Sequence, residues 1–170
     1  MTDNPKTGRR MERKNKNLAV LTEFMNRYGL STQTLGKVTG HDKTNYVIML
    51  SRDDAKISTL EKIFEAFGCD MEITIEYPGS TLTIETGAVT IPGMKPLRRL
   101  AAIDTEMRRR GITMTQMAQM IGVNKFNVIN WFKADDCKMS SMISMCDAMN
   151  VEPRYHLTAK KPNTRTATRD

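Results

Sequence analysis

The sequence predicts a mainly α-helical chain made of two tandem copies of one small four-helix unit, with a β-hairpin after the first copy. Three observations lead to this fold class. Shifting the sequence by 82 residues aligns residues 18–76 with residues 100–158 without a gap, and 13 of the 59 aligned pairs are identical. Apolar residues recur at helical spacing between glycines in both copies. After Gly68 the spacing changes to the alternation that is typical of strands.

Each copy is expected to contain four helices with recognisable ends. They begin at about Leu18, Ser31, Asp42 and Ser58 in the first copy, and at Leu100, Thr113, Asn124 and Ser140 in the second. Glycines end the first two helices of each copy, at Gly29, Gly40, Gly111 and Gly122. Two pairs of residues have the spacing of a capping box, Thr113 with Gln116 and Ser58 with Glu61.

The segment after the fourth helix of the first copy predicts a hairpin. Apolar and polar residues alternate over residues 71–77, Pro78 and Gly79 are a turn signal, and the alternation resumes over residues 82–84. The second copy carries only a short version of this pattern, at residues 154–158. An isolated hairpin is only marginally stable, so this one must pack on another surface.

The resulting domain organisation has five parts. They are a flexible basic arm (1–16), the first unit with its C-terminal strand (17–77), the return strand and linker (78–96), the second unit (97–158) and a flexible basic tail (159–170). The two end segments are polar and lack apolar periodicity, which is typical of disordered chain.

Charge is distributed unevenly along the chain. The formal net charge is +7, with +4 in residues 1–17, −3 in residues 18–77, +3 in residues 97–157 and +3 in residues 158–170. A basic protein favours a polyanionic partner. The two copies therefore differ in electrostatic character although they share one pattern of apolar residues.

Several functional classes lack support in the sequence. No stretch reaches the length of a membrane span and no secretory signal precedes the first unit, so a soluble cytoplasmic protein is expected. The cysteines, Cys69, Cys137 and Cys146, form no Cys-x-x-Cys pair and are expected to be buried thiols that hold no metal. Nucleotide-binding and catalytic motifs are absent, so neither enzyme activity nor a cofactor is expected.

The methionines give an expectation about the core. Met117, Met120, Met142, Met145 and Met149 recur at helical spacing. Methionine is flexible and fills irregular gaps in apolar cores. These five side chains are therefore expected to be buried, with a partner-binding stripe as the alternative.

Each copy contains a helix, a glycine turn and a second short helix, an arrangement that is typical of DNA-binding proteins. The major groove of B-DNA admits one α-helix with its side chains. In this region the second copy resembles the phage-repressor and Cro-type, or lambda-repressor-like, helix-turn-helix family. The matching residues are Thr113, Met117, Ala118, Ile121, Gly122, Val123, Asn124, Lys125, Asn127, Val128 and Trp131. The first copy departs from this pattern at Gly36, His41 and Met49.

The resemblance implies a set of DNA contacts. Base-edge contacts are implied for Asn124, Lys125, Phe126 and Asn130 in the second copy, and for Asp42, Lys43, Thr44 and Ile48 in the first. Asn127 is a further DNA-binding candidate. Phosphate contacts are implied for Thr113, Lys133 and Lys138, with Arg108, Arg109 and Arg110 as further candidates. Alternative roles are N-capping for Asn124, a core or partner-facing position for Phe126, and a solvated helix face for the three arginines.

These features lead to a functional hypothesis. The chain is expected to be a bacterial or phage transcription regulator that binds double-stranded DNA sequence-specifically and associates with the nucleoid. The second unit is expected to make most DNA contacts, because Asp42 opposes phosphates and Ile48 offers no polar group. The first unit then serves mainly in assembly. The alternative is a protein-interaction module, or an antitoxin-like regulator, whose first unit and hairpin bind a protein partner.

Two further expectations concern the hairpin and the N-terminal arm. Some members of the family dimerise through a strand added after the fourth helix, and this likeness implies a homodimer through residues 71–86. The alternative is a hairpin that covers the core of its own unit. The arm, residues 1–16, is a candidate for contacts with the DNA minor groove or backbone, with a solvated tail as the alternative.

Overall fold

The computed structural model describes residues 16–77 and 97–160. The first unit contains α2 (Ala19–Tyr28), α3 (Thr32–Thr39), α4 (Lys43–Arg52), α5 (Ile57–Ala66) and β1 (Cys69–Glu76). The second contains α6 (Ala101–Arg109), α7 (Met114–Ile121), α8 (Lys125–Ala134), α9 (Met139–Ala148) and β2 (Glu152–Ala159). The part of the chain that is described is thus mainly helical, with one two-stranded antiparallel sheet.

Local sequence signals account for most helix ends. Gly29 and Gly40 adopt positive φ angles of 62° and 75° where α2 and α3 end, a conformation that glycine adopts without strain. Ser31 caps α3 by accepting a hydrogen bond of 3.2 Å from the backbone amide of Thr34. The capping box of Thr113 and Gln116 is present, with hydrogen bonds of 2.8 and 3.1 Å. These predicted ends are confirmed.

The predicted capping box of Ser58 and Glu61 is wrong. Helix α5 begins at Ile57, and its N-cap residue, Lys56, makes no side-chain cap. Ser58 instead donates its backbone amide and its hydroxyl to Asp136 of the second unit. The Glu61 carboxylate is buried and accepts hydrogen bonds from arginines that precede α6. Long-range partners have therefore replaced a local pairing that the spacing alone permitted.

Each unit packs its helices and strand around apolar side chains. Four of the five methionines expected in the core are buried, namely Met117, Met142, Met145 and Met149, whereas Met120 is 48% exposed and that expectation is wrong. Trp131 is half-buried against the core of the second unit. Gly36 stands where the second unit has Ala118, and a Cβ atom there would lie 2.7 Å from the backbone oxygen of His41.

The sheet joins the two units. Strand β1 pairs antiparallel with β2 from Cys69 opposite Ala159 to Glu76 opposite Glu152. The short pattern recognised at residues 154–158 is thus part of a full strand that extends to Ala159. The expected return strand of the hairpin lies outside the described residues. Within them, the partner of β1 is the equivalent strand of the second copy.

An approximate two-fold axis relates the units. Ile73 and Tyr155 occupy equivalent positions of the repeat and face each other at the centre of the sheet. Lys56 and Lys138 are also equivalent and form an isolated antiparallel bridge. The backbone hydrogen bonds beside this bridge are reciprocal, Ile57 to Cys137 at 3.0 Å and Met139 to Ala55 at 2.8 Å. Reciprocal contacts of this kind define an isologous interface.

Side chains also cross between the units in reciprocal pairs. Asp54 accepts hydrogen bonds from the backbone amide and the hydroxyl of Ser140, at 3.1 and 2.6 Å. Asp136 accepts the equivalent bonds from Ser58, at 3.1 and 2.5 Å. Each aspartate therefore caps the fourth helix of the other unit, where a negative charge is favourable. These contacts explain why both copies carry the same aspartate and serine.

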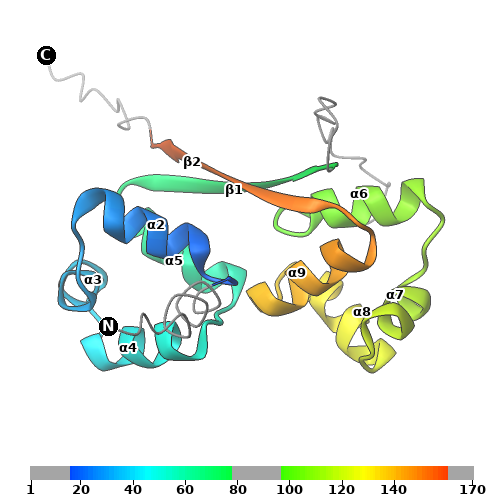
Figure 1. Ribbon diagram of the computed structural model, residues 1–170, viewed down its shortest axis with the longest axis horizontal. Helices are drawn as coiled ribbons and strands as arrows, with labels where there is room; N and C mark the ends of the chain where they lie inside the picture. The colour runs from blue at the N-terminus through cyan, green and yellow to red at the C-terminus, as the bar shows by residue number, and fades with distance from the viewer. Residues whose placement is uncertain (1–15, 78–96, 161–170) are drawn as a thin grey trace, which may run out of the picture.

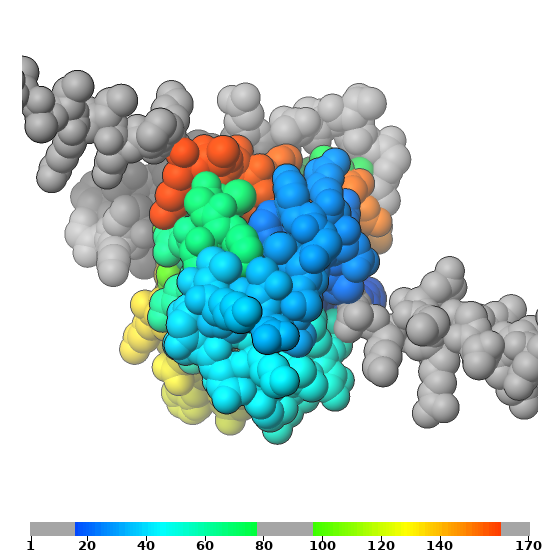
Figure 2. Space-filling view, turned by 90° about the vertical axis from the view of Figure 1, so that its left-hand side faces the viewer, coloured from blue at the N-terminus to red at the C-terminus, as the bar shows by residue number. Residues whose placement is uncertain are grey.

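The two units lie side by side beneath the sheet (Figure 1). Strands β1 and β2 run along one side of the molecule, and helices α4 and α8 lie on the opposite side. The view from the first unit shows α4, in cyan, at the far end from the orange-red β2 (Figure 2). The bridged Lys56 and Lys138 are exposed and lie in the loops that follow α4 and α8 in the chain.

Candidate nucleic-acid interface

Helices α4 and α8 each begin after a glycine turn with a side-chain cap. Asp42 accepts a hydrogen bond of 2.7 Å from the backbone amide of Thr44, and Asn124 accepts one of 2.9 Å from that of Phe126. The hydrogen bonds from Thr44 lower the pKa of Asp42, so this side chain is a carboxylate at the start of α4. Asn124 does serve as an N-cap. Only its Oδ1 atom is used, which leaves its amide hydrogens available to a ligand.

The start of α8 presents the predicted side chains to the outside. Lys125, Phe126, Asn127 and Asn130 are all exposed, whereas Val128 is fully buried. Phe126 is 60% exposed, so a core role for this residue is wrong. The Lys125 Nζ atom lies 5.2 Å from the centroid of the Phe126 ring, within the range of a cation–π contact. The start of α8 therefore presents one cation, one ring and several amide groups to the outside.

The equivalent surface of α4 is less polar. Lys43 and Thr44 are exposed, as predicted for DNA-binding residues, but Val47 and Ile48 are also 51% and 44% exposed. Val38 of α3 is another exposed apolar residue in the same helix pair. The first two turns of α4 thus combine Lys43 with exposed apolar residues.

The end of α6 and the start of α7 hold the other side chains predicted to contact phosphates. Thr113 is exposed, but its hydroxyl oxygen accepts the backbone amide of Gln116 in the capping box. Arg108 is paired with Asp104 at 2.8 Å, and both Arg109 and Arg110 are paired with Glu106. The three arginines are exposed at the end of α6, as the alternative of a solvated helix face expects, and each pairs with a carboxylate of that helix. Their contacts with phosphate stay a prediction.

A pair of lysines joins the loops that follow α4 and α8. Lys138 was predicted as a phosphate contact and is exposed; Lys56 is its equivalent and was missed. The hydrogen-bond pattern beside their bridge is that of a non-hydrogen-bonded antiparallel pair, in which side chains leave the same face at close range. Neither lysine has an ion-pair partner among the residues that the structure describes. Two facing like charges are unfavourable unless an anion lies between them.

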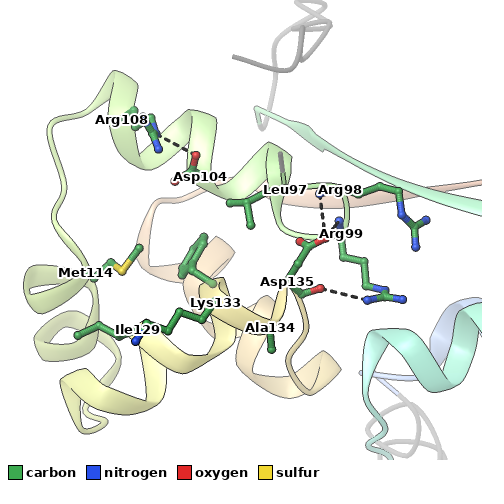
Figure 3. Close-up of a pocket in the computed structure, with 11 residues that line it drawn as sticks. Leu97, Arg98, Arg99, Asp104, Arg108, Met114, Ile129, Lys133, Ala134 and Asp135 are labelled. Atoms are coloured by element: carbon green, nitrogen blue, oxygen red, sulfur yellow. Dashed lines mark hydrogen bonds and ion pairs between the residues drawn. The ribbon is translucent and has the colours of Figure 1, made fainter. Parts of the chain in front are cut away.

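Lys133 borders a cavity of about 920 Å³ on the side of α8 that faces α6 (Figure 3). The apolar part of its lining consists of Leu97, Met114, Ile129, Phe132 and Ala134. The charges around it are largely satisfied internally, since Asp104 pairs with Arg108 and Asp135 accepts the backbone amide of Leu100 at 2.9 Å. Lys133 is exposed and has no ion-pair partner in the described ranges, so its charge is available on the outer surface of α8.

A second set of charges joins the two units through Glu106. This carboxylate is 4% exposed and accepts hydrogen bonds from Arg109, Arg110 and Tyr77, the last from the residue that follows β1 of the first unit. Burial alone would raise the pKa of Glu106, but these three donors outweigh burial and lower it to about 2. Glu106 therefore holds a buried negative charge between the units.

The low pKa of Glu106 predicts a loss of stability in acid. Because the pKa in the folded chain lies below the ordinary value of 4.5, the stabilisation is complete above that value and is lost as the pH falls towards 2. We expect about 2 to 3 kcal/mol to be lost from this group over that interval. Urea unfolding between pH 6 and 2.5 would measure it, with Glu106→Gln as the comparison. Identical pH dependence of the two proteins would contradict the prediction.

The three cysteines are not equivalent. Cys137 and Cys146 are buried as expected, and burial raises the pKa of each thiol to about 12. Cys69 is only half-buried.

In the described ranges, no three His, Cys, Asp or Glu side chains come close enough together to hold a metal ion. Of the helices described, none has the length and apolar character that a membrane span requires.

The described chain is thus a mainly helical protein whose two homologous units form one reciprocal interface and present their third helices on a common side. Comparison with protein families, with curated proteins and with solved structures finds no match.

Proposed function

We propose that the chain is a sequence-specific DNA-binding transcription regulator made of two lambda-repressor-like helix-turn-helix units in tandem. The observation that carries the proposal is the common placement of α4 and α8 on the side opposite the sheet, together with the bridge of Lys56 and Lys138 in the loops that follow these helices. Both helices begin with a capped, exposed first turn, which is the part of a recognition helix that meets base edges. The second unit makes most of the specific contacts.

The chemistry of α8 suits the edges of base pairs in the major groove. Lys125 matches the two acceptors of guanine, and Asn127 and Asn130 match the acceptor and donor of adenine. Phe126 provides an apolar surface for a thymine methyl group. Lys133, at the other end of α8, is suited to a phosphate. The exposed positions of these five residues support a role in DNA binding, as distinct from packing.

A protein partner is the second candidate, favoured by one observation. Val38, Val47 and Ile48 are all substantially exposed on the helix pair of the first unit. Apolar patches on a surface often mark contacts with other proteins. In this alternative, the first unit binds a protein while α8 has no DNA ligand.

Substitution of one lysine in each unit tests the proposal. Lys125→Ala is expected to weaken binding to a selected duplex roughly tenfold or more, because one base-edge contact is lost. Lys43→Ala is expected to cost less, because the first unit is net acidic and its α4 is less polar. Fluorescence anisotropy at low and moderate salt measures both. Equal losses would contradict the unequal roles of the units. Failure to bind any duplex, even random sequence at low salt, would favour the protein partner.

A further inference from the structure

The interface between the units uses the surfaces that a two-fold homodimer would use. The central pair of the sheet, Ile73 with Tyr155, and the bridge of Lys56 with Lys138 are both contacts between equivalent positions. The interface also contains reciprocal backbone and side-chain hydrogen bonds. In a homodimer such contacts form between two chains. Here one chain supplies both sides, so the edge of β1 that would receive a strand from another copy is occupied by β2.

The same approximate two-fold axis relates the position of α4 to that of α8. In two-fold dimers of helix-turn-helix proteins, the recognition helices enter successive major grooves about 34 Å apart on one face of the duplex. A homodimer presents identical side chains to the two half-sites, and its target is therefore a palindrome. Two unlike helices in the same arrangement read two unlike half-sites.

Equivalent positions of the two helices carry partly different side chains. Lys43 and Asn45 of α4 correspond to the identical Lys125 and Asn127 of α8, and all four are exposed. Three exposed pairs within the helices differ, namely Thr44 with Phe126, Ile48 with Asn130, and Ser51 with Lys133. The N-cap pair, Asp42 with Asn124, and the last pair, Arg52 with Ala134, are also exposed and different. The first helix thus offers a methyl-bearing hydroxyl and an aliphatic group where the second offers a ring and an amide.

We propose that one chain, without a second copy, binds an asymmetric duplex site whose half-sites differ at the base pairs facing these three positions. The inference rests on the proposed function. The shared lysine and asparagine contact the base pairs that the half-sites have in common. Ile48 contacts a thymine methyl where Asn130 contacts an adenine, because an aliphatic side chain has no partner for the polar adenine edge. The chain therefore binds its site in one orientation.

Selection from random duplexes with the full chain tests this inference. The wild-type chain is expected to select a site with unlike halves, and light scattering is expected to find one 19.3 kDa chain per duplex. Changing one half-site of the duplex to the sequence of the other should weaken its binding to the chain roughly tenfold for each base pair changed. A perfect palindrome, or two chains per site, would overturn the inference while leaving the DNA-binding function intact.

A pair of exchange variants makes the test independent of the natural target. The triple variant Thr44→Phe, Ile48→Asn and Ser51→Lys gives α4 these three side chains of α8, and it is expected to make the selected site more nearly a palindrome of the α8 half-site. The reverse variant, Phe126→Thr, Asn130→Ile and Lys133→Ser, is expected to make it more nearly a palindrome of the other half-site. All six side chains are exposed, and circular dichroism checks that the variants fold. Unchanged asymmetric sites in both variants would overturn the inference. A wild-type chain that binds no duplex would overturn the proposed function itself.

Discussion

Replacing Asp54 and Asp136 together by alanine is expected to lower the free energy of unfolding by about 3 to 5 kcal/mol. Each carboxylate accepts a backbone amide and a hydroxyl hydrogen bond from the serine of the other unit, with distances between 2.5 and 3.1 Å. Hydrogen bonds to a charged acceptor contribute more than neutral ones, and their loss leaves partly buried donors without partners. Each substitution also removes a cap from a helix of the opposite unit.

Urea unfolding monitored by circular dichroism measures this loss. The matched control is Asp70→Ala with Glu152→Ala, since these two residues are also equivalent in the repeat but are exposed on the sheet and make only longer ion pairs. Exposed ion pairs contribute little, so the control is expected to change stability by less than about 1 kcal/mol. A double variant at Asp54 and Asp136 that is as stable as this control would show that the reciprocal caps do not hold the units together.

Local signals predicted the helices because the physics at their ends is local. Positive φ at Gly40 and Gly122, and the caps at Asp42 and Asn124, depend only on residues within a few positions of each other. Lys125 is exposed in the first turn that Asn124 caps, and its contact with DNA stays a prediction. The helix boundaries could therefore be derived without knowledge of the tertiary structure.

The contact between the units could not be derived in the same way. A strand at residues 71–77 shows its alternation in the sequence but not its partner, which here lies in the second copy. Asp136 of the second unit replaced Glu61 as the partner of Ser58 for the same reason. The sequence did contain one signal of the contact between the units. Identical polar residues in the two copies cluster from Asp53 to Ser58, and a polar residue is expected to be the same in both copies where both make the same contact.

The helical spacing of the methionines also did not show how many of them α7 buries. Met120 follows Met117 by one helical turn, yet Met117 is fully buried and Met120 is not, because α7 packs on the core with a narrow face. Lys56 was missed for a different reason. In the sequence it is one lysine in a polar loop, and its significance arises only when the fold brings it opposite Lys138.

The lysine pair at the axis leads to the second large expected effect. Replacing Lys56 and Lys138 together by alanine is expected to reduce the dependence of DNA affinity on salt, lowering the slope of log K against log salt concentration by about 2. Each lysine that neutralises a phosphate releases about one counterion, so removal of two should weaken binding uniformly across DNA sequences. Stability is expected to be unchanged or slightly higher, because two facing like charges are removed.

The matched control removes two positive charges from the opposite side of the molecule. Arg154 lies on β2 and Lys160 follows it, so Arg154→Ala with Lys160→Ala gives the same change in net charge near the sheet. Titrations of both variants at several salt concentrations separate a contact at the axis from a general effect of charge. Equal salt slopes in the two variants would mean that the lysine pair meets no phosphate. A reduced slope only for Lys56 and Lys138 would place the duplex across the axis, where two unlike helices can contact one continuous site.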